Sequence, residues 1–393
     1  MLSIRALIVL PVVLLIGLGA VRAMTFVAPA SHPLRVLEPS FQAHPDAMIK
    51  RAMVEIGSAA RRGGAVPPSA RQTIAAAARK APLASDPFLV EGVIADMAGD
   101  GGRAEQLFAA ARNRDPRSEG ARYFLADRYF KTNRILPGLI EMAALARLSE
   151  KAAQPLIPAL AAYAQTPGAV DQLRRFFNLS PVLRDRTLAL LARDSRNAPL
   201  IFTLAPRALD RAAPLEWHAN LISSLIAAGD YSGAEALWRR LNGVADRGLL
   251  YNPQFRTVTA PPPFNWQFPV SAAGVAQPSD SGGLDVIYYG RNETVLATQL
   301  LRLAPARYRL SMRIAGRSGG GGLAWTISCL PANTTLASLS VGQGQGAIAG
   351  PIDIPAAGCP AQVLELRGRP VDSSGTAQLT ILDLQLKPLA ATP

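Results

Sequence analysis

The sequence has few of the residues that bind metal ions or carry redox chemistry. Its 393 residues include only two cysteines and three histidines. The histidines His32, His44 and His218 lie far apart along the chain, and no CxxC pair occurs. Metal and thiol-redox sites need such ligands at close, regular spacing. We therefore expect no metal site and no cofactor.

The sequence also lacks the short motifs of the common enzyme classes. It contains no Walker loop, no HExxH and no GxGxxG after a predicted strand. A glycosidase needs two carboxylates at a fixed separation, and the seven acidic residues beyond residue 250 form no recognisable motif. The glycine run at residues 318–323 indicates a flexible hairpin between strands. We predict that the protein is not an enzyme; a glycan-active enzyme stays an alternative.

Lysine is scarce and no long basic run occurs, although the chain is basic overall. Five of the 41 basic residues are lysine, and the formal net charge is +13. Residues 31–250 hold 29 basic against 21 acidic residues, and the residues after them hold 10 against 7. Because nucleic-acid binding usually concentrates its cations, we expect no nucleic-acid partner. An acidic polysaccharide or an anionic membrane surface suits this diffuse charge better.

Only the N-terminus contains an uncharged apolar run that approaches membrane length. Arg5 precedes the apolar residues 6–21, and the small-residue pattern of Val21, Arg22 and Ala23 is compatible with cleavage. Residues 1–23 therefore indicate either a signal peptide or an uncleaved signal anchor, with the anchor slightly favoured, followed by a linker at 24–33. Either alternative exports the rest of the chain. In a bacterium the protein would be anchored to the inner membrane facing the periplasm, or soluble in the periplasm after cleavage.

The two cysteines fit an exported protein. Cys329 and Cys359 lie thirty positions apart in the C-terminal part of the chain. An even pair of cysteines in an oxidising compartment most simply forms a disulfide. The sequence therefore predicts a bond between these two residues.

Residues 34–250 have the spacing of successive amphipathic helices joined by short connections. Within them, AGDGGRAEQLF at residues 98–108 recurs as AGDYSGAEALW at residues 228–238. Small residues allow two helices to approach closely, and an aromatic ring fills the gap between hairpins. The predicted packing residues are Gly92, Gly99, Ala104, Phe108, Ala111, Pro116, Gly229, Ala234 and Trp238. Glu105 and Glu235 also recur, and we interpret them as solvated residues.

This pattern resembles the tetratricopeptide repeat, which stacks helical hairpins into a curved array. The clearest predicted units are residues 85–118, 119–150 and 215–246. The third begins 130 residues after the first, which is not a multiple of 34, so the number of repeats between 151 and 213 stays open. The resemblance implies a surface that binds a protein partner.

The spacing changes at residue 251. A proline-rich linker is expected at 251–263, and residues 264–390 alternate apolar and polar residues in about eight short strands. The prediction is a multidomain protein, first α and then β, ending in an antiparallel β-sandwich of jelly-roll type. In one strand Tyr308 and Leu310 should face inward while Arg307 and Arg309 face solvent. A phase slip between Ile381 and Leu382 indicates a bulge.

Three features resemble the galactose-binding-like jelly rolls of carbohydrate-binding modules. These are an opening aromatic strand at Phe264, Asn265 and Trp266, the strand RYRLSMRI after Ala306, and the closing ILDLQLKP. Such modules often have glycine where Ala306 stands. The resemblance implies a sugar site made from an aromatic face and planar donors. The candidates are Trp266, Tyr288, Tyr289, Arg291, Asn292 and Gln299, of which at most one of the two tyrosines can be available.

We therefore expect an envelope scaffold that binds a protein through its repeats and contacts a glycan through its sandwich, in polysaccharide assembly or export. The alternative is a purely structural interaction protein in which the sandwich caps the helical array. The oligomeric state and the identity of any partner stay open.

Overall fold

The computed structural model describes residues 44–205, 215–245, 248–258, 260–280, 282–318, 322–341, 346–370 and 375–389. The expected signal segment at 1–23 and the linker at 24–33 lie outside these ranges. None of the helices described here is both long enough and apolar enough to cross a bilayer. The chain divides into two compact units: the described helices through α12 form the first, and α13, α14 and all the strands belong to the second.

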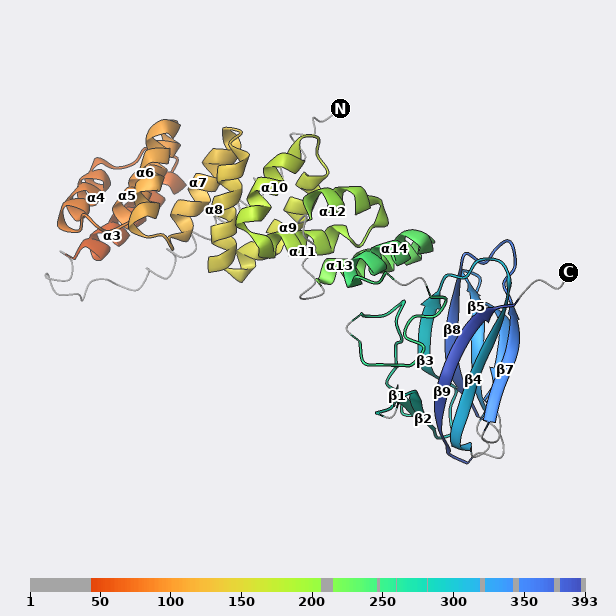
Figure 1. Ribbon diagram of the computed structural model, residues 1–393. Coiled ribbons are helices and arrows are strands. Elements are labelled where there is room, and N and C mark those ends of the chain that lie inside the picture. Colours follow the sequence, from red (N-terminus) through yellow and green to blue (C-terminus); the bar gives the residue numbers. More distant parts are fainter. Residues whose placement is uncertain are drawn as a thin grey trace. The chain divides into compact units, whose positions relative to one another are not determined.

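The first unit consists of helices (Figure 1). They are α3 (Pro45–Arg61), α4 (Pro68–Lys80), α5 (Asp86–Met97), α6 (Gly101–Arg114), α7 (Glu119–Lys131), α8 (Ile135–Leu148), α9 (Glu150–Ala164), α10 (Ala169–Leu179), α11 (Pro181–Leu191) and α12 (Ala198–Leu204). The short 3₁₀ turn η3 (Ser195–Asn197) lies between α11 and α12 in sequence, and its first two residues belong to the second unit. Helices α3 to α8 pack in sequence as three hairpins. The predicted array of hairpins is confirmed.

The hairpin α5–α6 shows why the repeated residues are needed. A Cβ on Gly92 would lie 2.6 Å from the Phe108 ring, so only glycine lets the two helices come this close. Gly99 has φ +79° in the turn, and the Asp100 side chain accepts a hydrogen bond from the Arg103 N–H at 3.0 Å, capping α6. Ala104, Phe108 and Ala111 are buried as predicted, whereas Pro116 is exposed.

Neighbouring hairpins are joined by rings and ion pairs. Phe108 stacks on Phe124 of α7, with ring centroids 4.7 Å apart and planes 6° from parallel. Glu141 of α8 is almost fully buried, and its carboxylate accepts hydrogen bonds from Arg112 of α6 and from Arg122 of α7, the latter at 2.7 Å. Because its two partners lie on two preceding helices, the carboxylate of Glu141 fixes the register of α6, α7 and α8.

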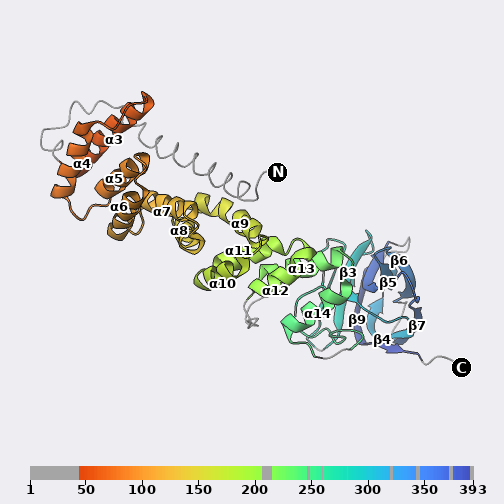
Figure 2. The same ribbon diagram turned by 90° about the horizontal axis from the view of Figure 1, so that it is seen from above.

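The second unit begins with the hairpin α13 (Glu216–Ala227) and α14 (Tyr231–Asn242). The strands follow: β1 (Gly274–Pro278), β2 (Leu284–Tyr288), β3 (Thr294–Leu301), β4 (Arg307–Ser318), β5 (Gly322–Leu330), β6 (Thr334–Ser340), β7 (Gly346–Asp353), β8 (Ala361–Arg369) and β9 (Ala377–Pro388). They form two antiparallel sheets, ordered β1-β2-β9-β4-β7 and β3-β8-β5-β6. Figure 2 looks down this sandwich, with β5 and β6 on one side and β4 and β7 on the other.

Most of the predicted alternation in the sandwich is confirmed. Tyr308 and Leu310 are buried, and Arg307 and Arg309 are exposed. The expected bulge is present, since the register of β4 with β9 shifts next to Asp383, which has φ +52°. Two strands were missed, β1 and β7, which are short or rich in glycine and alanine.

The expected opening strand at Phe264–Trp266 is wrong. These residues form no strand, and only the adjacent Gln267 makes an isolated bridge, to Thr298 of β3. Phe264 and Trp266 are nevertheless buried. The pair of aromatic residues therefore marks a segment that fills the core rather than one that extends a sheet.

The predicted disulfide is confirmed. Cys329 at the end of β5 is bonded to Cys359 in the loop before β8, with 5.1 Å between their Cα atoms. Because the crosslink closes a loop of thirty positions, the chain-entropy account predicts a contribution of about 3–4 kcal/mol to the free energy of unfolding.

Candidate binding surfaces

The residues proposed to hold a sugar do not come together as one site. Trp266, Tyr288 and Gln299 are buried, with 4%, 0% and 1% of their surfaces exposed. Tyr289, Arg291 and Asn292 are exposed between β2 and β3. The structure therefore divides the six candidates between the core and one loop.

Each buried candidate has a structural partner. The Nε1–H of Trp266 donates to the Asn252 carbonyl oxygen at 2.9 Å, and its ring packs against Phe255 and Trp325. The Tyr288 hydroxyl donates to the Asn292 carbonyl at 3.0 Å. The amide of Gln299 donates to the Tyr251 carbonyl at 2.9 Å. These groups stabilise the sandwich and are not available to a ligand.

The outward face of the five-stranded sheet is largely polar. Its three central strands are β2, β9 and β4. Their side chains on this face are Asp285, Ile287, Arg307, Arg309, Ser311, Arg313, Gln378, Thr380, Leu382, Gln385 and Lys387. None of these is aromatic. A ligand on this face would therefore be held by charge and hydrogen bonds rather than by ring stacking.

Two cations stand directly opposite each other on this face. Arg309 of β4 is paired in register with Lys387 of β9, and both are exposed. Their neighbours Arg307 and Arg313 have acidic partners, Asp353 and Asp383, at 3.1 and 2.9 Å. Within the part of the chain that the structure describes, neither Arg309 nor Lys387 has one. Like charges opposite each other on a sheet are unfavourable, so this pair can accommodate an anion.

The repeated glutamates were wrongly interpreted as solvated. Glu105 of α6 holds Arg134, at the start of α8 in the next hairpin, through both carboxylate oxygens. Glu235 of α14 holds Arg302, which follows β3, at 2.6 Å, and Arg239 at 2.8 Å. Each therefore joins its helix to the next module of the chain.

The electrostatics agree with this geometry. For Glu105, the hydrogen bond from Arg134 is the main reason that its pKa lies below the ordinary value. Burial alone would raise the pKa of Glu235, but the hydrogen bonds from Arg302 and Arg239 outweigh it and lower the pKa. Both carboxylates are therefore held in the charged form.

The repeated aromatic residues, like the repeated glutamates, join their helix to the next module of the chain. The Trp238 ring of α14 contacts Tyr251 and Phe264, with centroids 5.0 and 5.7 Å apart, and its Nε1–H donates to the Pro261 carbonyl at 2.7 Å. Phe255 and Leu250 lie in the sandwich core. The segment expected as a linker at 251–263 is thus packed between α14 and the sheets, and these sheets take the place of a further hairpin.

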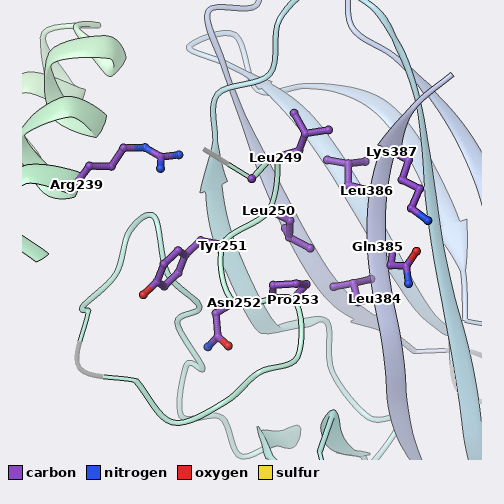
Figure 3. A pocket seen from close by; sticks show the side chains of 11 residues that line it. Arg239, Leu249, Leu250, Tyr251, Asn252, Pro253, Leu384, Gln385, Leu386 and Lys387 are labelled. Atoms are coloured by element: carbon purple, nitrogen blue, oxygen red, sulfur yellow. The ribbon is translucent and has the colours of Figure 1, made fainter. Parts of the chain in front are cut away.

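A pocket of about 340 Å³ lies beside this segment (Figure 3). It is lined by Arg239, Gly248, Leu249, Leu250, Tyr251, Asn252, Pro253, Leu384, Gln385, Leu386 and Lys387. Figure 3 shows Leu384 and Leu386 of β9 pointing toward Leu249 and Leu250, with Arg239 reaching in from α14. Its size lies at the low end of the range for ligand sites.

No cluster of three or more potential metal ligands occurs among the described residues. Sequence reasoning missed the pair of Arg309 and Lys387 because their opposition depends on strand register. The signal that could have found it was the row of arginines itself, on the solvated face of a strand.

The chain matches no protein-family profile and no curated sequence. Solved structures similar to parts of it include TmCBM61 in complex with β-1,4-galactotriose, at 17% identity and a TM-score of 0.26, over 37% of this chain and 100% of that one. Another is "MamA RS-1 ArsTM double mutant", at 16% identity and a TM-score of 0.27, over 51% and 98%. The enzymatically active domain of bacteriophage CBA120 tailspike protein 4 matches at 16% identity and a TM-score of 0.23, over 32% of this chain and 19% of that one.

Proposed function

We propose that this chain is a non-catalytic scaffold of the cell envelope, whose helical array binds a protein partner and whose sandwich contacts an acidic polysaccharide. The observation that carries the glycan part is the pair of Arg309 and Lys387 on the exposed sheet face. An acidic sugar would relieve the repulsion between the two cations. Ser311 and Gln385 are the next pair in register, and they supply hydroxyl and amide groups for the sugar hydroxyls.

This site differs in chemistry from the one expected from the sequence. The buried positions of Trp266 and Tyr288 leave them no part in it. Tyr289, Arg291 and Asn292 lie exposed on the loop between β2 and β3, where they would make secondary contacts. Binding through charge on a flat face favours a uronic-acid polymer over a neutral glucan.

The protein partner is proposed for the helical array. Stacked hairpins offer an extended surface whose outward side chains are free to vary while the packing residues stay fixed. On this array, Met53 and Val54 of α3 and Ile140 of α8 are apolar and partly exposed. Such side chains are suitable anchors for a partner.

The envelope location is supported by two features. The N-terminal residues 1–23 have the composition of a signal segment, and the disulfide between Cys329 and Cys359 suits an oxidising compartment. Together with an acidic glycan ligand, they favour a role in polysaccharide assembly or export.

The glycan proposal is tested by binding of the full chain to immobilised polygalacturonate and to dextran. We expect binding to polygalacturonate that weakens steeply with salt, and no comparable binding to dextran. The double variant Arg309→Gln/Lys387→Gln should bind at least tenfold more weakly. For a control matched in charge, the single variants are compared: Arg309→Gln should weaken binding, whereas Arg369→Gln, which removes one exposed cation from β8 in the other sheet, should leave binding unchanged. Equal losses in both single variants would mean that only net charge matters and would overturn the proposal.

A second candidate is the purely structural function, in which the sandwich caps the helices. It is favoured by the contacts of Glu235 and Trp238 with the sandwich. A full chain that binds neither polymer, but loses its ordered hairpin α13–α14 when these contacts are removed, would support this alternative instead.

A further inference from the structure

One edge of strand β9 is only partly covered. On one side, β4 pairs with β9 along nearly its whole length, out to Pro388. On the other side, β2 pairs only with residues 377–381. Beyond the bulge at Asp383, the described part of the chain places no strand beside β9 on that side. On this side, residues 384–388 of β9 therefore form an open sheet edge.

The direction of the main-chain groups follows from one hydrogen bond. The Leu389 N–H donates to the Arg307 carbonyl of β4 at 2.8 Å. Since successive residues of a strand point their N–H and C=O groups to opposite sides, Lys387 and Gln385 also face β4. Leu386 and Leu384 must then point theirs toward the open edge.

The pocket of Figure 3 lies along this edge. It is bounded by four consecutive residues of β9, 384–387, and by six consecutive residues of the facing segment, 248–253. Among the described residues, no main-chain partner occupies the edge positions of Leu384 and Leu386. The space is thus a slot between two stretches of backbone, with donors and acceptors at strand spacing along one wall.

We propose that this slot binds an extended peptide segment of a partner protein, which adds to the open edge of β9 as a further strand. Strand addition of this kind gains affinity from main-chain hydrogen bonds and specificity from alternate side chains. The inference concerns the edge of the sheet, whereas the proposed glycan surface is its outward face; Lys387 belongs to both, and the Leu249 variant described below separates them.

The lining defines the chemistry of the peptide. Side chains of an added strand alternate between the two faces of the sheet, as those of β9 do. On the inner side they meet Leu249, Leu384 and Leu386, which are apolar and buried or partly buried. On the outer side they meet the exposed Lys387. The matching segment alternates apolar and acidic residues, a pattern that an oligosaccharide cannot reproduce.

The probe is a labelled, blocked hexapeptide in which valine and glutamate alternate, titrated into the full chain. We expect saturable binding, and protection of the Leu384 and Leu386 amides from hydrogen exchange by at least tenfold. The Gln385 amide, which faces β4, should not change. Two further peptides carry N-methyl groups, one on its valines and the other on its glutamates. One of the two should bind at least tenfold more weakly, because the N–H groups that face β9 can then no longer donate.

Leu249→Trp fills the slot from the facing segment and should weaken the hexapeptide at least tenfold, without affecting binding to polygalacturonate. Leu336→Trp on β6 is the matched control, since it adds the same ring to a partly buried position in the other sheet. Binding of the hexapeptide without protection of Leu384 and Leu386 would overturn the proposal. So would protection of those amides in the free chain that rises with protein concentration, because a second copy would then occupy the edge.

Discussion

The two copies of the repeated motif, residues 98–108 and 228–238, build the same turn but dock onto different modules. In both, the central glycine has φ +79° and the aspartate after it caps the following helix. In both, the glutamate carboxylate accepts a hydrogen bond from an arginine farther along the chain. In the first copy that arginine belongs to another helical hairpin, and in the second it belongs to the β-sandwich.

The difference between the copies lies in what each aromatic residue meets. Phe108 stacks flat on one ring of the next helix, Phe124. Trp238 meets two rings at steep angles and adds a hydrogen bond to Pro261. The comparison teaches that the motif encodes a docking face, with a ring and a carboxylate at fixed positions, rather than a particular neighbour. A sheet can use this face as well as a helix can.

The largest expected effect comes from removing the two rings. Phe108→Ala and Trp238→Ala should each cost about 3–5 kcal/mol of the free energy of unfolding, because both rings are fully buried. All four tryptophans, Trp217, Trp238, Trp266 and Trp325, belong to the second unit. Urea unfolding followed by tryptophan fluorescence should therefore report the loss in Trp238→Ala and stay unchanged in Phe108→Ala, whose loss appears in circular dichroism.

Trp238→Phe serves as a control for the ring contact, since it keeps an aromatic ring but loses the hydrogen bond to Pro261 and part of the indole volume. We expect it to cost about 1–3 kcal/mol, less than Trp238→Ala. If Phe108→Ala shifted the fluorescence transition as much as Trp238→Ala does, the two copies would not serve separate modules.

A second test addresses the equivalent position on the first helix of each hairpin. Gly92 in the first copy corresponds to Ile222 in the second, 130 residues later. Ile222→Ala should cost about 2–4 kcal/mol because it leaves a cavity. Gly92→Ala should cost about 1–3 kcal/mol for the opposite reason, because the added methyl group collides with Phe108. Thermal unfolding of the two variants measures both, and a stabilised Gly92→Ala would contradict the close packing described.

The two turns should respond alike. Gly99→Ala and Gly229→Ala place a Cβ on a residue with φ +79°, where open space surrounds it and only backbone strain is added. Each should lose about 1–2 kcal/mol. Unequal losses in calorimetry, with Gly→Asn variants as the milder control, would show that the turns are not equivalent.

The ion pairs should have smaller effects because the arginines are partly exposed. Arg302→Gln removes the partner that joins Glu235 to the sandwich and should cost at most about 1 kcal/mol. Arg134→Gln removes the corresponding partner of Glu105 in the first unit. Limited proteolysis near residues 251–263 should accelerate only in Arg302→Gln. Equal cleavage of both variants would show that Glu235 does not secure the sandwich.

The dependence on pH sharpens the same point. Because the pKa of Glu235 in the folded chain lies below its ordinary value of 4.5, its ion pairs contribute fully above that pH and are lost as the pH falls through the lowered pKa. The second unit should therefore lose stability on acidification below about pH 4.5, and Glu235→Gln should reduce that loss. An unchanged acid transition in this variant would contradict the role of the carboxylate.

Local patterns sufficed to predict most elements. Helical spacing with proline and glycine boundaries predicted α3 to α11, α13 and α14, and strict alternation predicted β4 and its bulged partner β9. Strand β7 escaped notice because its glycine and alanine residues give little contrast between its two faces. The aromatic residues near 264 suggested a strand, but their burial depends on segments that are distant in sequence.

The functional residues were harder to predict for the same reason. The sequence alone does not distinguish an aromatic side chain that fills a core, as Trp266 and Tyr288 do, from one that is exposed and can stack on a sugar. In the sequence, Glu105 and Glu235 resemble solvated residues, because the arginines that pair with them lie 29 and 67 residues farther along the chain. The pair of Arg309 and Lys387 exists only because β4 and β9 are adjacent and in one register.

Most helices and strands, the turns and caps, and the disulfide could be read from the chain alone. Periodicity and backbone preference are local properties, and a chain with two cysteines can form only one internal disulfide. Only the tertiary structure decided which side chains are buried, which charges meet and where a sheet edge stays open. These depend on contacts between residues far apart in the chain, and the free energy of such contacts is set by register and burial rather than by residue type.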